Sequence, residues 1–579
     1  MSKKLVIVES PSKSKTIGQY LGNNYQVLSS KGHIRDLAIS GPGGLGVDVE
    51  HHFKPTYVVL NDKKLIVKEL NQALKDADEL FLATDPDREG EAISWHLKET
   101  LNVGKKPFKR VIFNEITKDA VKEAFDQPLE IDMALVESQE TRRILDRIIG
   151  FKLSKLLQNK IKSKSAGRVQ SACLKLIVVR EKEINAFVEQ EYYDVAAIFD
   201  GFRAGLYKYK GKTPKLLDRE TKDAVLANLG EEYIVVSAET KPKSTYSRLP
   251  FITSTLEQEA STKFNFTSTK TMQIAQRLYE GVEIGSESIG LITYMRTDST
   301  RISQVFQKQA GDFITSQFGK EYLGFARKVS AKANIQDAHE AIRPTSAFRT
   351  PESIKRYLSK DEFQLYSIIY SRAVAYFMKP SISDVTTVLI ENHDSLFRAS
   401  SSKLVFDGYL RLYGNYESKE DEEELEASMP PMKQFQVLKA LSVDAKQQFT
   451  TPPPRYSEAK LIKEMEDLGI GRPSTYAQTI QTLRNRRYVS ISDKRFIPTE
   501  QGIKTIEKLD EYFSEFISSN YSKQMENVLD KVASNKEQGE NVLREFYDYF
   551  TPLVDHASHK MDKEKPEETG EICPKCGHK

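Results

Sequence analysis

Cysteine is scarce in this chain, which has three cysteines and one tryptophan among 579 residues. So few cysteines exclude a fold that is stapled by disulfides. Cys173 lies in the apolar run "SACLKLIVV", which predicts a thiol buried in the core. The other two, Cys573 and Cys576, form "CPKCGHK", and the sequence stops three residues later.

This C-x-x-C pair supplies half of the ligands of a four-ligand zinc ribbon. We therefore expect a truncated chain, whose native form continues with at least one more cysteine pair and binds Zn²⁺ only at full length. A redox C-x-x-C is the less favoured alternative, because no βαβ pattern surrounds Cys573 and Cys576.

Long apolar runs are absent as well. A stretch of about 18 apolar residues is needed to span a bilayer, and the sequence has none. The opening "MSKKLVIVESPSKSKTI" holds only a short apolar block, too short for the core of a secretory signal. We therefore expect a cytoplasmic protein with no membrane partner.

Two motifs that carry chemistry are also missing. The glycine cluster "GPGGLG" at 41–46 lacks the Lys-Ser/Thr of a Walker motif, so it predicts a mobile loop, and nothing in the chain indicates use of ATP. The stretch "HEAIR" at 339–343 has arginine where a zinc protease requires its second histidine, which excludes that class of enzyme.

The net charge is small, at +3, but the charged residues are unevenly distributed. Between Arg142 and Lys182 there are twelve Lys or Arg residues and only two acids. A solvated helical face is the common explanation of such a stretch. Here Gly, Ser, Asn and Gln are interleaved in "LLQNKIKSKSAGRVQSA", which favours contact with an extended polyanion such as a nucleic-acid backbone.

The chain is longer than the roughly 250–300 residues that one hydrophobic core supports, so several domains are expected. Over about the first 130 residues the strand patterns "KLVIV", "ELFLAT" and "RVIFNEI" alternate with helical ones, which predicts a parallel sheet with helices on both faces. Beyond it the pattern is helical to 190, β-rich over 191–250 and 380–450, helical over 251–379, and helical again after the proline run at 451–459. The β-rich region is thus interrupted, and discontinuous domains are expected.

Four carboxylates are predicted at the ends of the parallel strands. Asp85, Asp87 and Glu89 lie two residues apart in "TDPDREGE", directly after a strand, and Glu9 ends the first strand. Ligands bind at this edge of such sheets, and hard oxygen donors favour Mg²⁺ over Zn²⁺. Clustered surface acids are commonly just solvated. The matching Glu9, with Lys13 one turn into the next helix, favours a metal site suited to phosphodiester chemistry.

No nucleophile is evident from local pattern. Tyr294 lies in the apolar strand pattern "GLITYM", where an aromatic residue is more often core than catalytic. Arg296, expected on the same strand face, could stabilise a phosphoryl group. His339 and Arg343 could contact a scissile phosphate or be structural. The residues by themselves indicate a metal-dependent enzyme or a binder of nucleic acid, with its nucleophile unidentified.

Ten stretches, in order from residue 5 to about residue 483, together resemble one family. They are "LVIVESPSKSKTI", "GHIRDL", "ATDPDREGEAISWHL", "FNEIT", "TRRILDRIIGFKLS", "SAGRVQSACLKLIVVRE", "PFITSTLEQEAS", "LITYMRTDSTRIS", "DAHEAIRPT" and "IGRPSTYAQTIQTL". They are similar to the motifs of bacterial DNA topoisomerase I, a type IA topoisomerase. Topoisomerase III shares the site, but the "VESPSK" opening and incipient zinc ribbon are more similar to topoisomerase I. Reverse gyrase needs a helicase module that this sequence lacks.

The resemblance implies a multidomain fold of α/β, α and β parts, a four-domain torus that is expected to be monomeric. Its implied domains are a Toprim domain (1–130), a helical DNA-binding domain (131–190 and 451–563), a β-rich arch (191–250 and 380–450), a helical domain with the nucleophilic tyrosine (251–379), and a linker leading to the truncated zinc ribbon (564–579).

The resemblance also implies roles at the site of reaction. Tyr294 matches the nucleophile, which attacks one DNA strand to give a 5′-phosphotyrosyl link and a free 3′-hydroxyl. Arg296 would stabilise the phosphoryl group. Glu9 matches the acid that protonates the leaving 3′-oxygen, with Lys13 as its electrostatic helper, and His339 would contact the scissile region.

The implied cofactor is Mg²⁺, with Mn²⁺ as a possible substitute, held by Asp85, Asp87, Glu89 and Glu9 and needed chiefly for rejoining. The implied substrate is single-stranded or negatively supercoiled DNA in the nucleoid. ATP is not needed, because a tyrosyl phosphodiester keeps the energy of the broken bond. The residues implied to grip the strand are His33, Arg143, Arg147, Arg168, Gln170, Arg343, Arg472 and Arg486.

Two other functions stay open on the residues alone: a metal-dependent nuclease or primase, in which Tyr294 would be dispensable, and a non-catalytic single-strand binder. Only the topoisomerase needs the acids, Tyr294 and Arg296 together. One departure from some relatives is the longer segment "VEIGSESIG" at 282–290, expected to enlarge a loop. If the zinc ribbons are truncated, we expect cleavage without efficient relaxation.

Overall fold

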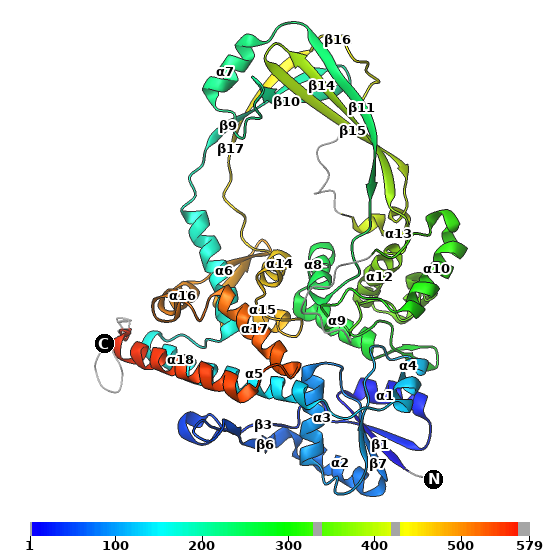
Figure 1. Cartoon of the computed structure of the whole chain (residues 1–579), viewed down its shortest axis with the longest axis vertical. Coiled ribbons are helices and arrows are strands. Elements are labelled where there is room, and N and C mark those ends of the chain that lie inside the picture. The colour runs from blue at the N-terminus through cyan, green and yellow to red at the C-terminus, as the bar shows by residue number, and fades with distance from the viewer. Residues whose placement is uncertain (1–2, 328–338, 418–428, 565–579) are drawn as a thin grey trace, which may run out of the picture.

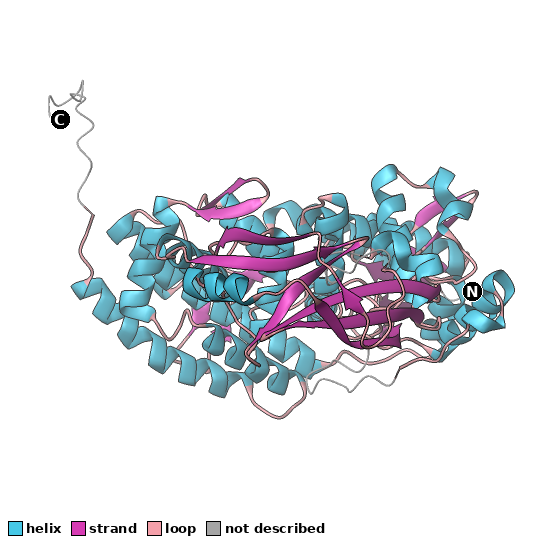
Figure 2. Ribbon diagram, turned by 90° about the horizontal axis from the view of Figure 1, so that it is seen from above, coloured by secondary structure: helices cyan, strands magenta, loops and turns pink. Residues whose placement is uncertain are grey.

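The computed structural model describes residues 3–327, 339–417 and 429–564. Its ribbon traces a ring in Figure 1, with a sheet arching over a helical base. Figure 2, from above, shows the strands of this arch lying across the helices. Cys573 and Cys576 lie outside the described residues. Within the described part of the chain, no helix combines the length and the apolar character needed to cross a membrane.

The N-terminal region is built on a parallel sheet in the order β2-β1-β7-β8. Its strands are β1 (Lys4–Val8), β2 (Tyr25–Ser29), β7 (Glu79–Leu82) and β8 (Phe108–Arg110), and its helices are α1 (Pro11–Leu21), α2 (Lys64–Asp76), α3 (Arg88–Thr100) and α4 (Lys118–Asp126). Side chains alternate along β1, so Leu5 and Ile7 pack with α2 and α3, whereas Val6 and Val8 pack with α1 and α4. Both faces of the sheet are therefore covered.

Local sequence explains where the helices after β1 and β7 begin. The side chain of Ser10 caps α1 by accepting a hydrogen bond from the backbone N–H of Lys13, at 3.2 Å. Asp87 caps α3 in the same way, accepting from the N–H of Gly90 at 2.8 Å. Glycine is required at 90, because a Cβ there would lie 2.1 Å from the carbonyl oxygen of Asp85. The acidic loop is thus folded tightly at the strand end.

Helices that precede the arch in the sequence and helices that follow it share a second core. They are α5 (Met133–Ile161), α6 (Arg168–Asn185), α14 (Glu458–Leu468), α15 (Tyr476–Asn485), α16 (Glu500–Phe513), α17 (Ser519–Ala533) and α18 (Gly539–Lys560). A hairpin of β18 (Val489–Ser492) and β19 (Arg495–Pro498) interrupts what the sequence pattern predicts as helical throughout. Its tight turn places Asp493 and Lys494 at positive φ, which local helical periodicity does not reveal.

The arch is an antiparallel sheet in the order β16-β11-β14-β15-β10-β9-β17. Its strands are β9 (Glu191–Phe199), β10 (Phe202–Tyr209), β11 (Tyr233–Thr245), β14 (Ser381–Asn392), β15 (Ser395–Phe406), β16 (Val437–Leu438) and β17 (Ser442–Phe449), with α7 (Arg219–Asn228) against them. Strands before and after residues 251–379 therefore lie in one sheet (Figure 1).

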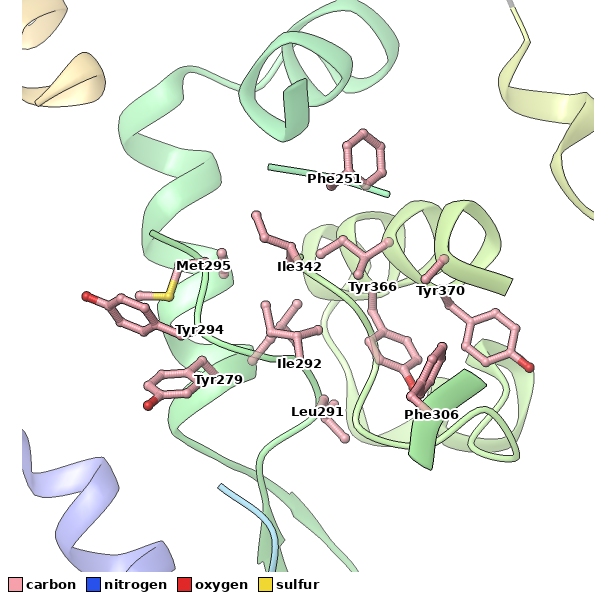
Figure 3. Packing of buried hydrophobic residues seen from close by; sticks show 14 of the residues in the cluster. Phe251, Tyr279, Leu291, Ile292, Tyr294, Met295, Phe306, Ile342, Tyr366 and Tyr370 are labelled. Carbon is pink, nitrogen blue, oxygen red and sulfur yellow. The ribbon is translucent and has the colours of Figure 1, made fainter. Parts of the chain in front are cut away.

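The described residues between 251 and 379 form a largely helical region that carries Tyr294. Its main helices are α8 (Thr253–Phe264), α9 (Ser268–Glu280), α10 (Gln304–Phe318) and α12 (Lys360–Ala375). Figure 3 shows part of its core, in which the hydroxyls of Tyr279 and Tyr294 point the same way out of the cluster. This core is continuous with the sheet face that carries Val6 and Val8, so the two regions share buried surface.

The segment around Tyr294 is not the strand that the apolar pattern predicts. Only Ile292 makes a β-bridge, with Pro344. The backbone N–H of Tyr294 donates instead to the carbonyl of Asn114, at 2.8 Å. Because successive residues bond to different parts of the chain, no regular ladder forms.

The segment "VEIGSESIG", expected as a larger loop, is a hairpin of β12 (Val282–Ile284) and β13 (Glu287–Ile289). The hairpin contacts α1, where the hydroxyls of Ser288 and Thr16 lie 2.7 Å apart. The hairpin thus packs on the N-terminal region.

Candidate active site

Glu9 and Asp85 lie side by side because β1 and β7 are neighbouring parallel strands that end at the same edge. The backbone N–H of Asp85 donates to Oε1 of Glu9 at 2.7 Å. Burial, and then the negative charge of Asp85, raise the pKa of Glu9 to about 8. A carboxyl group with this pKa is mostly protonated at neutral pH, which is the state that can donate a proton.

Lys13, on α1, is fully buried and pairs with Oδ1 of Asp85. Burial acts to lower the pKa of Lys13, but Asp85 and Glu9 outweigh it and raise that pKa. The lysine is therefore a fixed positive charge beside Glu9 and Asp85.

Tyr294 meets the acidic loop from the opposite side. Its hydroxyl donates to Oδ2 of Asp87 at 2.6 Å, and Nη1 of Arg296 lies 3.6 Å from the same oxygen. Burial, followed by the charges of Asp85 and Asp87, raises the pKa of Tyr294 well above its usual value. Burial also acts to raise the pKa of Asp87, but Arg296 and the Tyr294 hydroxyl outweigh it and hold that pKa low. A neutral phenol thus faces an ionised carboxylate and a guanidinium.

His339 lies beside Tyr294, the candidate nucleophile. The centroids of the two rings are 6.0 Å apart. Its Nε2 lies 2.5 Å from the carbonyl oxygen of Pro86, so Nε2–H donates to the acidic loop. The side chain is 4% exposed. His339 therefore joins the acidic loop to the tyrosine, with its other ring nitrogen free of this contact.

The predicted metal acids each have a protein partner in this conformation. Asp85 is paired with Lys13 and Asp87 with Arg296, and Oε2 of Glu89 lies 2.9 Å from Nε2 of His33. Across the described residues, no three His, Cys, Asp or Glu side chains are arranged to hold a metal ion.

The carboxylate oxygens of these acids are nevertheless the kind of ligand that a hard cation such as Mg²⁺ prefers. Asp85 and Asp87 lie close enough to Glu9 that both raise its pKa. A divalent cation would relieve this crowding of negative charge. Binding by these acids would require Asp85 and Asp87 to exchange their present partners.

Two hollows adjoin the site. A small one, of about 80 Å³, is lined by Asp87, Arg296, His339 and Arg472. A larger groove, of about 1080 Å³, runs from Glu9 and Asp85 between α9 and α15. Arg296 lines both, so the groove leads to the residues that surround Tyr294.

The residues predicted to grip DNA occupy different environments. Arg472 lines the small hollow and donates from Nη2 to Asp530 at 3.0 Å. Arg486 is exposed at the end of α15. Nε of Arg143 donates to Asp36 at 3.0 Å. These arginines are at or near the surface, where a phosphate could reach them.

The other predicted contacts are engaged within the protein. Nη2 of Arg147 donates to the carbonyl of Leu37 at 3.1 Å, and Nε2 of Gln170 to that of Ser165 at 3.2 Å. Arg168 is buried, and its Nη2 donates to Oε1 of Glu526 at 2.8 Å.

Arg343 is also buried, 4% exposed, and bonds to two carboxylates: Nη1 lies 2.9 Å from Glu115, and Nε 2.8 Å from Glu340. For Arg168 and Arg343 this conformation shows structural ion pairs, and DNA contact stays a prediction.

Sequence reasoning missed two residues at the site. The ring of Tyr279 lies 5.3 Å from that of Tyr294 and 5.4 Å from Nζ of Lys13. Arg110 is fully buried at the end of β8, and its Nη2 donates to the carbonyl of Asp85 at 2.8 Å. The only available signal was the charge of Arg110 next to the apolar run "VIF", since nothing local distinguishes Tyr279 from a core tyrosine.

Comparison with known proteins agrees with this geometry. A family model described as DNA topoisomerase matches residues 130–544, and the Toprim domain model matches residues 4–116. The structure of full-length topoisomerase I from Thermotoga maritima is similar, with a TM-score of 0.85 and 41% sequence identity over 95% of this chain and 90% of that chain. The predicted fold class and enzyme class are thereby confirmed. The chain belongs to the DNA topoisomerase family and is a bacterial type IA topoisomerase, an isomerase that acts on DNA.

Proposed function

We propose that this chain changes DNA topology by cutting one strand with Tyr294 and rejoining it. One observation carries the proposal: the Tyr294 hydroxyl, with Arg296 beside it, is 2.6 Å from Asp87, in the loop whose Asp85 N–H donates to Glu9. A nucleophile, a guanidinium for the phosphoryl charge and a protonated acid are the groups that transesterification of a phosphodiester requires.

In the cleavage step, the phenolic oxygen of Tyr294 forms a bond to phosphorus while the bond from phosphorus to the 3′-oxygen breaks. The phenolic proton passes to Asp87, which already accepts the hydrogen bond of this hydroxyl. The leaving 3′-oxygen takes the proton of Glu9, and Arg296 offsets the charge on the phosphoryl oxygens. Rejoining is the reverse, with the 3′-hydroxyl as nucleophile.

Asp85, Asp87, Glu89 and Glu9 are the residues that would hold Mg²⁺. When bound there, the cation would neutralise phosphate charge, which is the chemistry a Toprim acid set supplies. We propose that this serves rejoining above all, because the carboxylates lie at the strand ends where the 3′-hydroxyl must be held.

No hydrolysis of ATP is needed in this scheme. The phosphotyrosyl bond keeps the energy of the broken phosphodiester, so the reaction is close to energetically balanced. The stress in negatively supercoiled DNA supplies the direction, and the covalent bond keeps one end from being released while another strand passes.

A labelled oligonucleotide tests the proposal. Single-stranded DNA labelled at its 3′ end is incubated with the protein, and detergent then stops the reaction. The label should become attached to the wild-type protein and not to Tyr294→Phe. Tyr366→Phe is the matched control, because that buried tyrosine only donates to the carbonyl of Arg349, at 2.7 Å. Label in freed, hydrolysed fragments would instead indicate a nuclease, and retention of intact strands a binder.

A second label tests the acid. With the label at the 5′ end, the released fragment should carry a free 3′-hydroxyl that a DNA polymerase can extend. A fragment ending in 3′-phosphate would contradict both the direction of attack and the role of Glu9.

A further inference from the structure

A short segment after β8, residues 113–116, bonds directly to the region that carries the nucleophile. The N–H of Tyr294 donates to the carbonyl of Asn114 at 2.8 Å, and the N–H of Gly290 to that of Ile116 at 3.1 Å. The hydroxyl of Tyr279 donates to the carbonyl of Phe113 at 3.2 Å. These bonds span from the N-terminal region to residues 251–379, so they are part of the seam between the two regions and would have to break if the regions separated.

Glu115 adds an ion pair to this seam. Its Oε2 lies 2.9 Å from Nη1 of Arg343. Arg343 is in turn bonded to the residue before the nucleophile: Thr293 N–H donates to its carbonyl, and its own N–H donates to Oγ1 of Thr293, both at 2.9 Å. Glu115 therefore reaches Tyr294 through Arg343 and Thr293, without touching any reacting atom.

The ion pair of Glu115 with Arg343 can break without leaving Arg343 unpaired. Arg343 has a second carboxylate, Glu340, at 2.8 Å on its own side of the seam. If Glu115 withdraws, the buried guanidinium of Arg343 keeps Glu340 as its partner. Most buried ion pairs are costly to break because one charge is left without a partner, and here that does not happen. Glu115, whose side chain is 20% exposed, would simply gain water.

We propose that Glu115 is a positioning residue, which holds Tyr294 against the acid site through Arg343. Its ion pair with Arg343 breaks when the cut strand opens and forms again when it closes. This inference rests on the proposed function. Rejoining depends on bringing the phosphate on Tyr294 back to the 3′-hydroxyl near Glu9. The pair therefore acts mainly on the return, whereas a strand already bound in the closed form can still be cut.

Glu115→Gln tests this role, because glutamine keeps the shape and an acceptor oxygen but loses the charge. Rejoining is followed as the decay of labelled adduct after a jump to high salt, which prevents new binding. It should slow about tenfold, as expected for loss of one charge-assisted hydrogen bond. The initial rate of adduct formation should stay close to wild type, so adduct accumulates.

Glu130→Gln is the matched control, because Glu130 is an exposed acid near β8 and forms an ion pair with Lys109, at 3.2 Å. Rejoining in Glu115→Gln equal to that in Glu130→Gln would overturn the proposal, as would an equal loss of cleavage and rejoining. If the wild-type protein forms no adduct, the proposed function itself fails, which is a separate result.

Tyr279→Phe gives an independent reading of the seam should Glu115→Gln fold poorly. It removes the hydrogen bond to Phe113 but keeps the ring that packs on Tyr294. Slower rejoining is again expected. Wild-type rejoining in this variant, with thermal unfolding unchanged, would contradict a positioning role for the seam.

Discussion

The hydroxyl of Tyr294 donates a 2.6 Å hydrogen bond to Oδ2 of Asp87, a residue 207 positions earlier in the chain. The contact crosses from the helical region to the parallel sheet, and Arg296 shares the same carboxylate oxygen at 3.6 Å. In this conformation the acidic loop covers the hydroxyl of Tyr294, the proposed nucleophile. A DNA phosphate bound by Arg296 would draw this guanidinium away from Asp87, while the Tyr294 hydroxyl would keep its hydrogen bond to the carboxylate.

Asp87→Asn is predicted to weaken Mg²⁺ binding by at least about tenfold, because it removes one charged oxygen donor from the set. Calorimetric titration of the DNA-free protein with Mg²⁺ measures this without relying on activity. Asp62→Asn is the control, since Asp62 is an exposed acid of the same region. Equal Mg²⁺ affinity in the two variants would remove Asp87 from the metal site.

Glu9→Gln is predicted to slow cleavage by about 10²- to 10⁴-fold, the usual worth of a general acid, because glutamine cannot protonate the 3′-oxygen. Glutamine can still accept the hydrogen bond from the N–H of Asp85, so the strand ends should keep their arrangement. The rate of labelled adduct formation measures the effect, with thermal unfolding as the check on folding. Cleavage at the wild-type rate would exclude Glu9 as the acid.

The arrangement of the acids could be predicted from sequence because it follows from a general rule. Parallel strands end at one edge of a sheet, so Glu9 and Asp85 could be expected at the same edge once the two strands were recognised. That β1 and β7 are also neighbours is a finding of the structure. Tyr294 could not be found in this way. Its pattern is that of a buried residue, and it is indeed 2% exposed, because it packs in the core and presents only its hydroxyl to the site.

The partners of the arginines were beyond sequence reasoning for a different reason. Arg168 looks like a DNA contact in a basic, polar stretch, but Glu526, which neutralises it, is 358 positions away on α17. Arg343 likewise meets Glu115 across the seam. Local pattern carries no information on such long-range pairing, and the family resemblance implied DNA contact for both arginines without showing these partners.

Arg168 and Arg486 should therefore respond differently to alanine. Arg168→Ala leaves Glu526 buried beside fewer cations, and is predicted to lower the free energy of unfolding by about 3–5 kcal/mol. Arg486→Ala is predicted to change it by less than about 0.5 kcal/mol. Chemical denaturation of both variants measures the difference. A loss for Arg168→Ala as small as that for Arg486→Ala would contradict a structural role for the ion pair of Arg168 with Glu526.

Arg486→Ala should instead weaken binding of single-stranded DNA and reduce the dependence of log K on log salt by about 0.7, the value for one phosphate contact on a single strand. Fluorescence anisotropy at several salt concentrations gives this slope. Arg219→Ala, at an exposed position on the arch helix α7, is the control. An unchanged slope in Arg486→Ala would place this residue outside the path of the strand.

Glu257 lies on α8, where this helix packs against α14. It is fully buried, and neither carboxylate oxygen has a hydrogen-bond partner within the described part of the chain. Burial, and then the nearby charge of Glu458 at the start of α14, raise its pKa well above the ordinary value of 4.5. The folded protein therefore holds Glu257 protonated in a pH range where the unfolded chain does not.

The sign of the resulting pH dependence follows from proton counting. Above pH 4.5 the unfolded chain releases the proton of Glu257 while the folded protein keeps it, so stability falls as pH rises, by about 1.4 kcal/mol per unit, until the folded pKa is passed. Glu257→Gln removes this slope. Its melting temperature relative to wild type should therefore increase from pH 5 to pH 8, and parallel pH profiles for the two proteins would show that Glu257 is ionised in the folded state.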